Sequence, residues 1–201
     1  MLNFFKEVFK KGELRRKVVF TLGILFVFRL GAGIVIPYID TSAITSAATS
    51  SGIFGIMNML GGGTLEKFSL FSLGVSPYIT SSIIIELLSM DVIPALAQWN
   101  KEGNTGKKKK DKVTRVLTLA LAIIQGGSLT YAFDKGYSIL ASSSIWTYVY
   151  VVIVMAAGSM FTMWLGDQIT IKGVGNGTSL LIFTGTVSYT HLRAHETLRH
   201  L

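Results

Sequence analysis

Long apolar runs alternate with short polar blocks along this chain. Five apolar segments stand out, at residues 18–36, 68–90, 113–133, 145–165 and 178–187. Each of the first four is long enough, as a helix, to cross about 30 Å of hydrocarbon, whereas the fifth stops early. Pro77 lies within the second segment, and Gln125, Gly126 and Gly127 interrupt the third. The pattern predicts an all-α, polytopic membrane protein.

The composition supports this prediction and excludes several other classes. Half of the 201 residues are hydrophobic, 15% are charged, and the mean hydropathy is +0.52, which is too apolar for one soluble domain. The net charge of +8 comes from basic residues in blocks between apolar runs, so direct nucleic-acid recognition is not expected. The chain has no cysteine, which excludes disulfides and thiolate metal sites. No cofactor is expected.

The basic blocks predict the orientation in the membrane. Lys and Arg number six in residues 1–17, seven in residues 91–115 and one in residues 166–177. The two connections on the other side carry one each, Lys67 and Lys135. Basic residues concentrate in cytoplasmic segments, so the N-terminus is predicted to be cytoplasmic. Residues 1–17 are expected either as an amphipathic helix on anionic lipid or as a solvated basic tail.

A short apolar piece and a run of glycines precede the second apolar segment, and both are predicted to be external. The apolar piece, Gly55–Leu60, is too short to span a membrane, and Gly61–Gly63 follow it. The second segment then contains Pro77 and several serines and threonines. Such residues are tolerated at membrane depth where protein or water satisfies the backbone. We therefore expect the second segment to face protein or a cavity on at least one side.

Apart from Arg115, which ends the basic block at residues 91–115, two charged residues fall inside the predicted spans. Arg29 is expected to snorkel to the far interface or to pair with a carboxylate, and a structural role is favoured over a functional one. Glu86 lies near the end of its span, where it can reach the interface or a polar groove, and snorkelling is favoured. A secondary transporter would have intramembrane carboxylates or unwound segments for ion coupling, but neither Arg29 nor Glu86 is expected at a helix break. An intramembrane enzyme would need Ser/His or Asp pairs, which do not occur within the spans.

Two connections and the C-terminal residues complete the pattern. Residues 91–112 are predicted to be a lysine-rich hydrophilic loop, and the GVGNG run, Gly173–Gly177, is predicted to be a tight turn. Residues 188–201 change character abruptly and hold all three histidines. The spacing of these histidines does not fit a zinc helix. This tail is interpreted as foreign to the protein.

Three stretches resemble the bacterial SecY family of the protein-translocation channel: Phe71–Leu88, Met163–Phe183 and Asn100–Gly106. The resemblance implies a ten-helix channel of two halves, each of five helices, of which this chain holds the first half with a truncated fifth helix. It implies a non-enzymatic subunit that passes unfolded preproteins across the cytoplasmic membrane and releases signal and transmembrane segments into it. Implied partners are SecE, SecG, the SecA motor and the ribosome. The partial chain is not expected to translocate alone.

The resemblance also assigns site residues. The external plug corresponds to residues 55–66, with Gly55, Ile56, Met57, Asn58, Met59, Leu60, Gly61, Gly62 and Gly63 as its candidates. The pore ring corresponds to Val75, Ile79, Thr178 and Ile182, where Thr178 departs from the usual aliphatic residue. Ser76, Thr80, Ile83 and Leu87 are candidates for a lateral gate. Val75 and Ile79 are four residues apart and share a helix face. Ordinary helix packing, or a re-entrant loop in place of the plug, explains the same residues without any gating.

Overall fold

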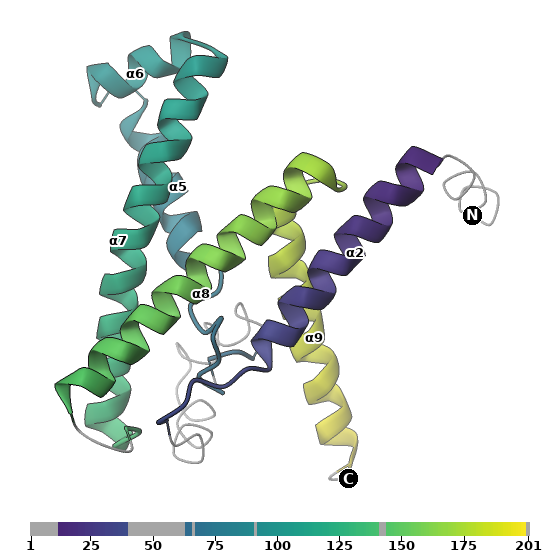
Figure 1. Ribbon diagram of the computed structural model, residues 1–201, viewed down its shortest axis with the longest axis vertical. Coiled ribbons are helices and arrows are strands. Elements are labelled where there is room, and N and C mark those ends of the chain that lie inside the picture. The colour runs from purple at the N-terminus through teal and green to yellow at the C-terminus, as the bar shows by residue number, and fades with distance from the viewer. Residues whose placement is uncertain (1–11, 40–62, 66, 91, 141–143, 200–201) are drawn as a thin grey trace.

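The computed structural model describes residues 12–39, 63–65, 67–90, 92–140 and 144–199. These residues form six helices and no β-strand, apart from isolated bridges that join Val35 to Ser69 and Ile39 to Leu140. In chain order the helices are α2 (Gly12–Ala32), α5 (Ser76–Leu88), α6 (Pro94–Lys101), α7 (Asn104–Tyr137), α8 (Ile145–Lys172) and α9 (Gly177–Arg199) (Figure 1). The predicted all-α class is confirmed.

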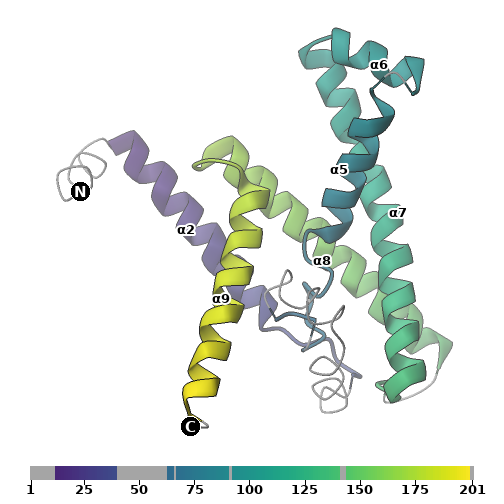
Figure 2. The same ribbon diagram turned by 180° about the vertical axis from the view of Figure 1, so that it is seen from behind.

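Apart from α6, which lies across one end of the molecule, the helices run alternately up and down in Figure 1. α8 packs against α7, α9 and α2, while α5 and α6 pack on α7. α5 and α9 lie behind α8 in Figure 1 and in front of it in the reverse view of Figure 2. In the described part of the chain, α7 and α8 are long and apolar enough to cross a membrane, whereas α5 and the start of α9 are shorter apolar helices.

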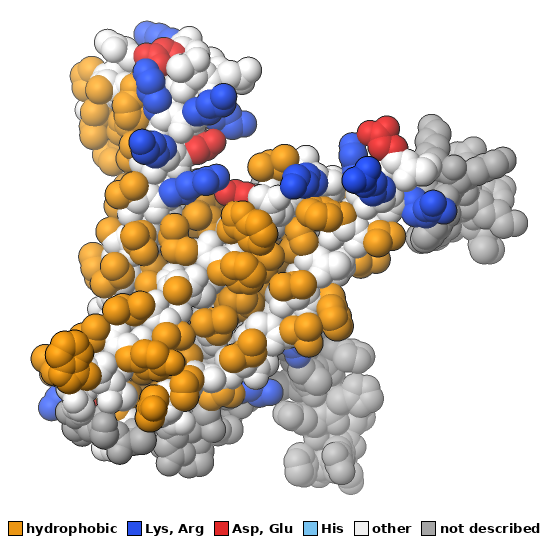
Figure 3. All heavy atoms as spheres, in the orientation of Figure 1, with side chains coloured by type: hydrophobic (Ala, Val, Ile, Leu, Met, Phe, Trp, Pro, Cys, Tyr) orange, Lys and Arg blue, Asp and Glu red, His pale blue; other side chains and the backbone are white. Residues whose placement is uncertain are grey.

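Charged side chains gather at one end of the molecule. Figure 3 shows lysines and arginines around α6 and the start of α7, near the end of α8 and at the start of α2, with hydrophobic side chains covering the region beneath them. The basic blocks at residues 101–115, Lys172 and Arg15–Lys17 are separated in sequence. The alternating helices bring them to this common end.

The second apolar segment is not one continuous helix. A span was predicted over residues 68–90, but α5 begins at Ser76, and residues 67–75 form turns. Pro77 lies in the first turn of α5, where a missing N–H costs nothing. Before it, Gly74 has φ +53°, and Ser72 Oγ donates to the carbonyls of Thr64 and Ser69. These local bonds compete with helix formation.

The connections on the basic side are more helical than predicted. The expected loop at 91–112 contains α6 and the first residues of α7, because lysines are good helix formers. α8 extends seven residues past the predicted end at 165, to Lys172. The expected turn at Gly173–Gly177 is present, but it is limited to residues 173–176, since Gly177 begins α9.

The first and fifth helices also differ from their predicted bounds. α2 covers residues 12–32, so it begins before the predicted span at 18–36 and ends four residues before its predicted end, and residues 1–11 of the predicted N-terminal segment lie outside the described residues. The helical backbone of α9 passes Val187 and continues to Arg199. This continuity does not determine the origin of residues 188–201, and their foreign origin stays a prediction.

Arg29 lies in the last turn of α2 with an exposed side chain. No ion pair of Arg29 occurs among the described residues, and both predicted roles stay predictions.

Two hydrophobic clusters form the core, and the turns at 63–65 and 67–75 contribute to both. One cluster packs α7 against the first half of α8 and includes Leu65, Phe68 and Leu73. The other packs α2 against the second half of α8 and α9 and includes Phe71 and Val75. The segment before α5 therefore lies between the two clusters.

Candidate functional site

An apolar groove lies between α7 and α9, next to the first turn of α5. Its volume is about 610 Å³. It is lined by the segment before α5, by three residues of α5, by one face of α7 and by one residue of α9: Ser72, Leu73, Gly74, Val75, Ser76, Ile79, Thr80, Ile124, Gln125, Ser128, Leu129, Ala132 and Ile182.

Three of the four predicted ring residues meet at this groove. Val75 immediately precedes α5 and is 8% exposed, and its carbonyl accepts a hydrogen bond from Ile79 N at 3.0 Å. Ile79 lies one turn further along α5, and Ile182 reaches the groove from α9. Thr178, one turn before Ile182, lines a different cavity. The structure thus groups the aliphatic candidates and separates the hydroxyl from them.

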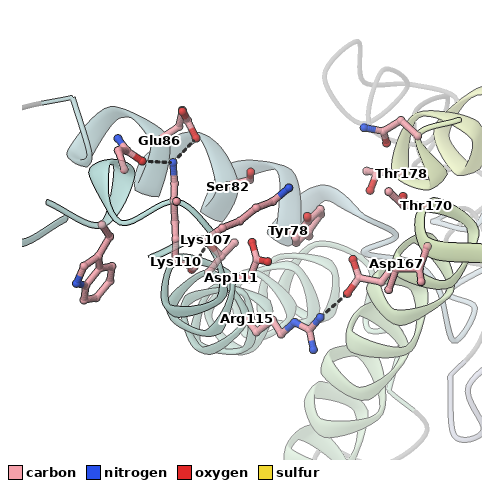
Figure 4. A pocket seen from close by; sticks show the side chains of 16 residues that line it. Tyr78, Ser82, Glu86, Lys107, Lys110, Asp111, Arg115, Asp167, Thr170 and Thr178 are labelled. Carbon is pink, nitrogen blue, oxygen red and sulfur yellow. Dashed lines mark hydrogen bonds and ion pairs between the residues drawn. The ribbon is translucent and has the colours of Figure 1, made fainter. Parts of the chain in front are cut away.

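That second cavity is a polar cleft on the basic side, with a volume of about 620 Å³. Figure 4 shows Tyr78, Ser82 and Glu86 of α5 and the α7 side chains facing Thr170 and Thr178 across it. Its lining contains three basic and three acidic residues: Lys107, Lys110, Arg115, Glu86, Asp111 and Asp167. Charge in this cleft is therefore balanced, which does not favour an anion or a cation.

Lys110 joins three helices at one end of the cleft. Its Nζ donates to Glu86 Oε2 at 2.7 Å, to Ser89 Oγ at 3.2 Å and to Asn100 Oδ1 at 3.5 Å. The Lys110 side chain is only 18% exposed, whereas that of Glu86 is 57% exposed. Glu86 thus lines the polar cleft and pairs with a lysine of α7 while more than half of its side chain stays exposed, and snorkelling of this residue stays a prediction.

A second ion pair bridges α7 and α8 across the cleft. Arg115 Nη2 lies 2.8 Å from Asp167 Oδ2, as Figure 4 shows.

Side chains accept hydrogen bonds from the backbone in the turn before α9. Asn176 Oδ1 accepts from Ser179 N at 3.2 Å, and Thr170 Oγ1 accepts from Gly177 N at 2.9 Å. Asn176 is thus the N-cap of α9, and the glycine run serves as a turn.

The candidates for a lateral gate lie along one side of α5. Ile83 is 54% exposed and Leu87 is 57% exposed. Ser76 is also exposed, and Thr80 Oγ1 donates to the Ser76 carbonyl at 3.1 Å. Within the described part of the chain, this apolar face has little cover.

Most of the predicted plug lies outside the described residues, since Gly55 to Gly62 and residue 66 belong to ranges that the structure does not describe. Gly63 is described, and its φ of +79° is one that glycine adopts without strain. No group of three or more His, Cys, Asp or Glu side chains suited to a metal occurs among the described residues.

Sequence reasoning missed two residues of α8 that contact the backbone of the segment before α5. Ser159 Oγ of α8 donates to the Gly74 carbonyl at 3.1 Å, and Gly158 lies against the Leu70 carbonyl. A serine and a glycine inside an apolar run indicate close helix approach in general. They give no hint of which segment approaches.

Comparison with known proteins places this geometry in a family. The SecY family model matches residues 69–197. The protein translocase subunit SecY 1 of Lactobacillus kefiranofaciens is 44% identical over 190 residues, and the SecY subunit of Bacillus subtilis is 42% identical over 190 residues. Each alignment covers 94% of this chain and 44% of the relative. The chain thus spans less than half the length of these curated relatives.

Two solved structures share the fold. They are described as Sec61 in the canine ribosome-channel complex from the endoplasmic reticulum and as the structure of a protein conducting channel. Each superposes with a TM-score of 0.60 at 17% identity, over 85% of this chain and 36% of the solved one. At this identity the likeness supports the fold alone.

Proposed function

Because this chain belongs to the SecY family, we propose that it forms the first half of the pore-forming subunit of the Sec translocon. In this role it passes unfolded preproteins across the bacterial cytoplasmic membrane and releases signal and transmembrane segments into the lipid. It has no enzymatic activity of its own, and it acts together with the remainder of the family channel.

The observation that carries this proposal is the meeting of Val75, Ile79 and Ile182 at one apolar groove. Aliphatic side chains at a constriction exclude water and ions by dewetting. They also offer no fixed hydrogen bond to a passing polypeptide. We propose these three residues as this half's share of the pore ring, with Thr178 at the polar cleft on the cytoplasmic side. The plug would be the external region at residues 55–66.

The charge distribution supports an orientation with the N-terminus in the cytoplasm. The basic end of the molecule contains the start of α2, the α6–α7 turn and the end of α8 (Figure 3). Anionic lipid, the SecA motor and the ribosome would meet the channel on this side, while SecE and SecG would pack around the helices. A reporter fused at Gly103 should be cytoplasmic, and one fused at Ser138 should be external. The reverse pattern would overturn the orientation.

The ring is tested by ion conductance of the assembled full-length channel in a planar bilayer. Val75→Lys should make the resting channel leak ions, because a charge at the constriction holds water there. Val75→Leu is the matched control, since it keeps an aliphatic side chain and should remain closed. Resting conductance of the lysine variant equal to that of the unsubstituted channel would remove Val75 from the ring.

A further inference from the structure

The segment at residues 68–75, which we call the entry segment, positions the first ring residue. It is not helical, and the helical hydrogen bonds of α5 reach it at its end, where the Val75 carbonyl accepts from Ile79 N. Its side chains alternate between the two hydrophobic clusters: Phe68 and Leu73 enter one, and Phe71 and Val75 enter the other. Any shift of this segment therefore moves Val75 relative to Ile79 and Ile182.

Two adjacent residues of α8 contact the backbone of the entry segment. Ser159 Oγ donates to the Gly74 carbonyl at 3.1 Å, and Ser159 is 1% exposed. A Cβ placed on Gly158 would lie 1.9 Å from the Leu70 carbonyl oxygen, so the backbones pass without room for a side chain. α8 thus touches the entry segment at two points four residues apart.

The hydrogen bond from Ser159 acts on the peptide unit that carries Val75. The Gly74 carbonyl and the Val75 nitrogen belong to one planar peptide group. Gly74 has φ +53°, a conformation that glycine adopts readily and that gives this peptide more freedom than other residues allow. A donor from a neighbouring helix restricts that freedom, and it does so immediately before α5 begins.

We infer that Ser159 is a positioning residue, which orients the Gly74–Val75 peptide so that the Val75 side chain faces the constriction. This inference rests on the proposed function, because it assigns Ser159 a role through Val75. Ser159 itself does not line the apolar groove. Its effect on the seal is indirect.

The test measures the reactivity of a single cysteine in the assembled full-length channel, from which other cysteines have been removed. This chain contributes none, so Val75→Cys provides a clean probe for a water-soluble thiol reagent. Val75→Cys alone should react slowly. Adding Ser159→Ala should raise the labelling rate about five- to tenfold, the population change expected when one buried hydrogen bond is lost. Ser159→Thr, which keeps a hydroxyl, should return the rate toward that of Val75→Cys alone.

Ser81→Ala is the matched control. Ser81 is also fully buried, and its Oγ donates to the Thr114 carbonyl of another helix at 2.7 Å. The control therefore removes an equivalent buried bond that does not involve the entry segment, and it should leave Cys labelling unchanged at equal channel abundance. An unchanged rate in Ser159→Ala, or an equal rise in Ser81→Ala, would overturn the inference.

The Val75→Lys conductance measurement separates this inference from the proposed function. If Val75→Lys leaks but Ser159→Ala leaves both labelling and resting conductance unchanged, the ring stands and Ser159 has no positioning role. If Val75→Lys does not leak, Val75 is not part of a seal, and the proposed function itself fails at this residue.

Discussion

Gly158→Ala is expected to destabilise the chain, whereas a glycine-to-alanine change at an unhindered helix position is stabilising. The new Cβ would lie 1.9 Å from the Leu70 carbonyl oxygen, whereas Cβ contacts below 3.0 Å are essentially never found. The two backbones must therefore separate by at least the difference, 1.1 Å. Leu70 resists this movement, because its N–H donates to the Ile34 carbonyl at 2.9 Å. We expect a loss of about 3 kcal/mol, at the upper end of the usual cost of overpacking.

The assay is the free energy of unfolding in mixed micelles, titrated with a denaturing detergent. Gly23→Ala is the control, since Gly23 lies in α2 with no atom within 4 Å of its added Cβ. This control should stabilise the chain by about 0.5–1 kcal/mol, because alanine is the better helix former. Equal free energies of unfolding for the two variants would refute the close approach of α8 to the entry segment.

Three further predictions follow from the described contacts. Phe68→Ala should cost about 3–5 kcal/mol of unfolding free energy, because Phe68 is fully buried and packs edge-to-face with Phe133. The control Phe183→Ala, at a side chain that is 65% exposed, should cost less than about 1 kcal/mol. A double-mutant cycle on Arg115 and Asp167 should give a coupling of about 1 kcal/mol or less that falls with added salt, because the arginine side chain is 53% exposed; a larger, salt-independent coupling would contradict this. Asn176→Ala should destabilise the chain by about 0.5–2 kcal/mol through loss of the α9 N-cap, and Asn176→Asp should be nearly neutral in the same titration.

The apolar runs predicted the helices well where packing and hydropathy agree. α7 and α8 contain the predicted segments 113–133 and 145–165 in full, because long apolar runs without a proline form helices in a membrane. Their ends were less predictable. The runs stop where the side chains become polar, but the helices continue through Lys172 and begin before the lysine run, since lysine favours a helix in water or at an interface.

The entry segment could not be predicted from hydropathy. Residues 68–75 are as apolar as the helix that follows, yet they form turns, in which Gly74 has a φ of +53° and Ser72 Oγ donates to the Ser69 carbonyl. The contacts of Ser159 and Gly158 were also inaccessible, because Ser159 and Gly74 are 85 residues apart in sequence. The resemblance to the family pointed to Val75, but only the structure shows what holds it.

The turns before α5 change how the proposed constriction depends on the rest of the chain. A residue inside a helix is held by helical hydrogen bonds at both its N–H and its carbonyl, whereas Val75 precedes α5 and joins that network through its carbonyl, so its position also depends on its neighbours. Those neighbours come from two directions: α8 touches the Gly74 carbonyl, and Gly31 of α2 lies against the Phe71 ring, where an added Cβ would be 2.3 Å away. If Val75 belongs to the proposed ring, substitutions in α2 and α8 that are remote from it in sequence should alter the seal without touching the groove. Ile79 lies within α5 and should be less sensitive to such substitutions than Val75.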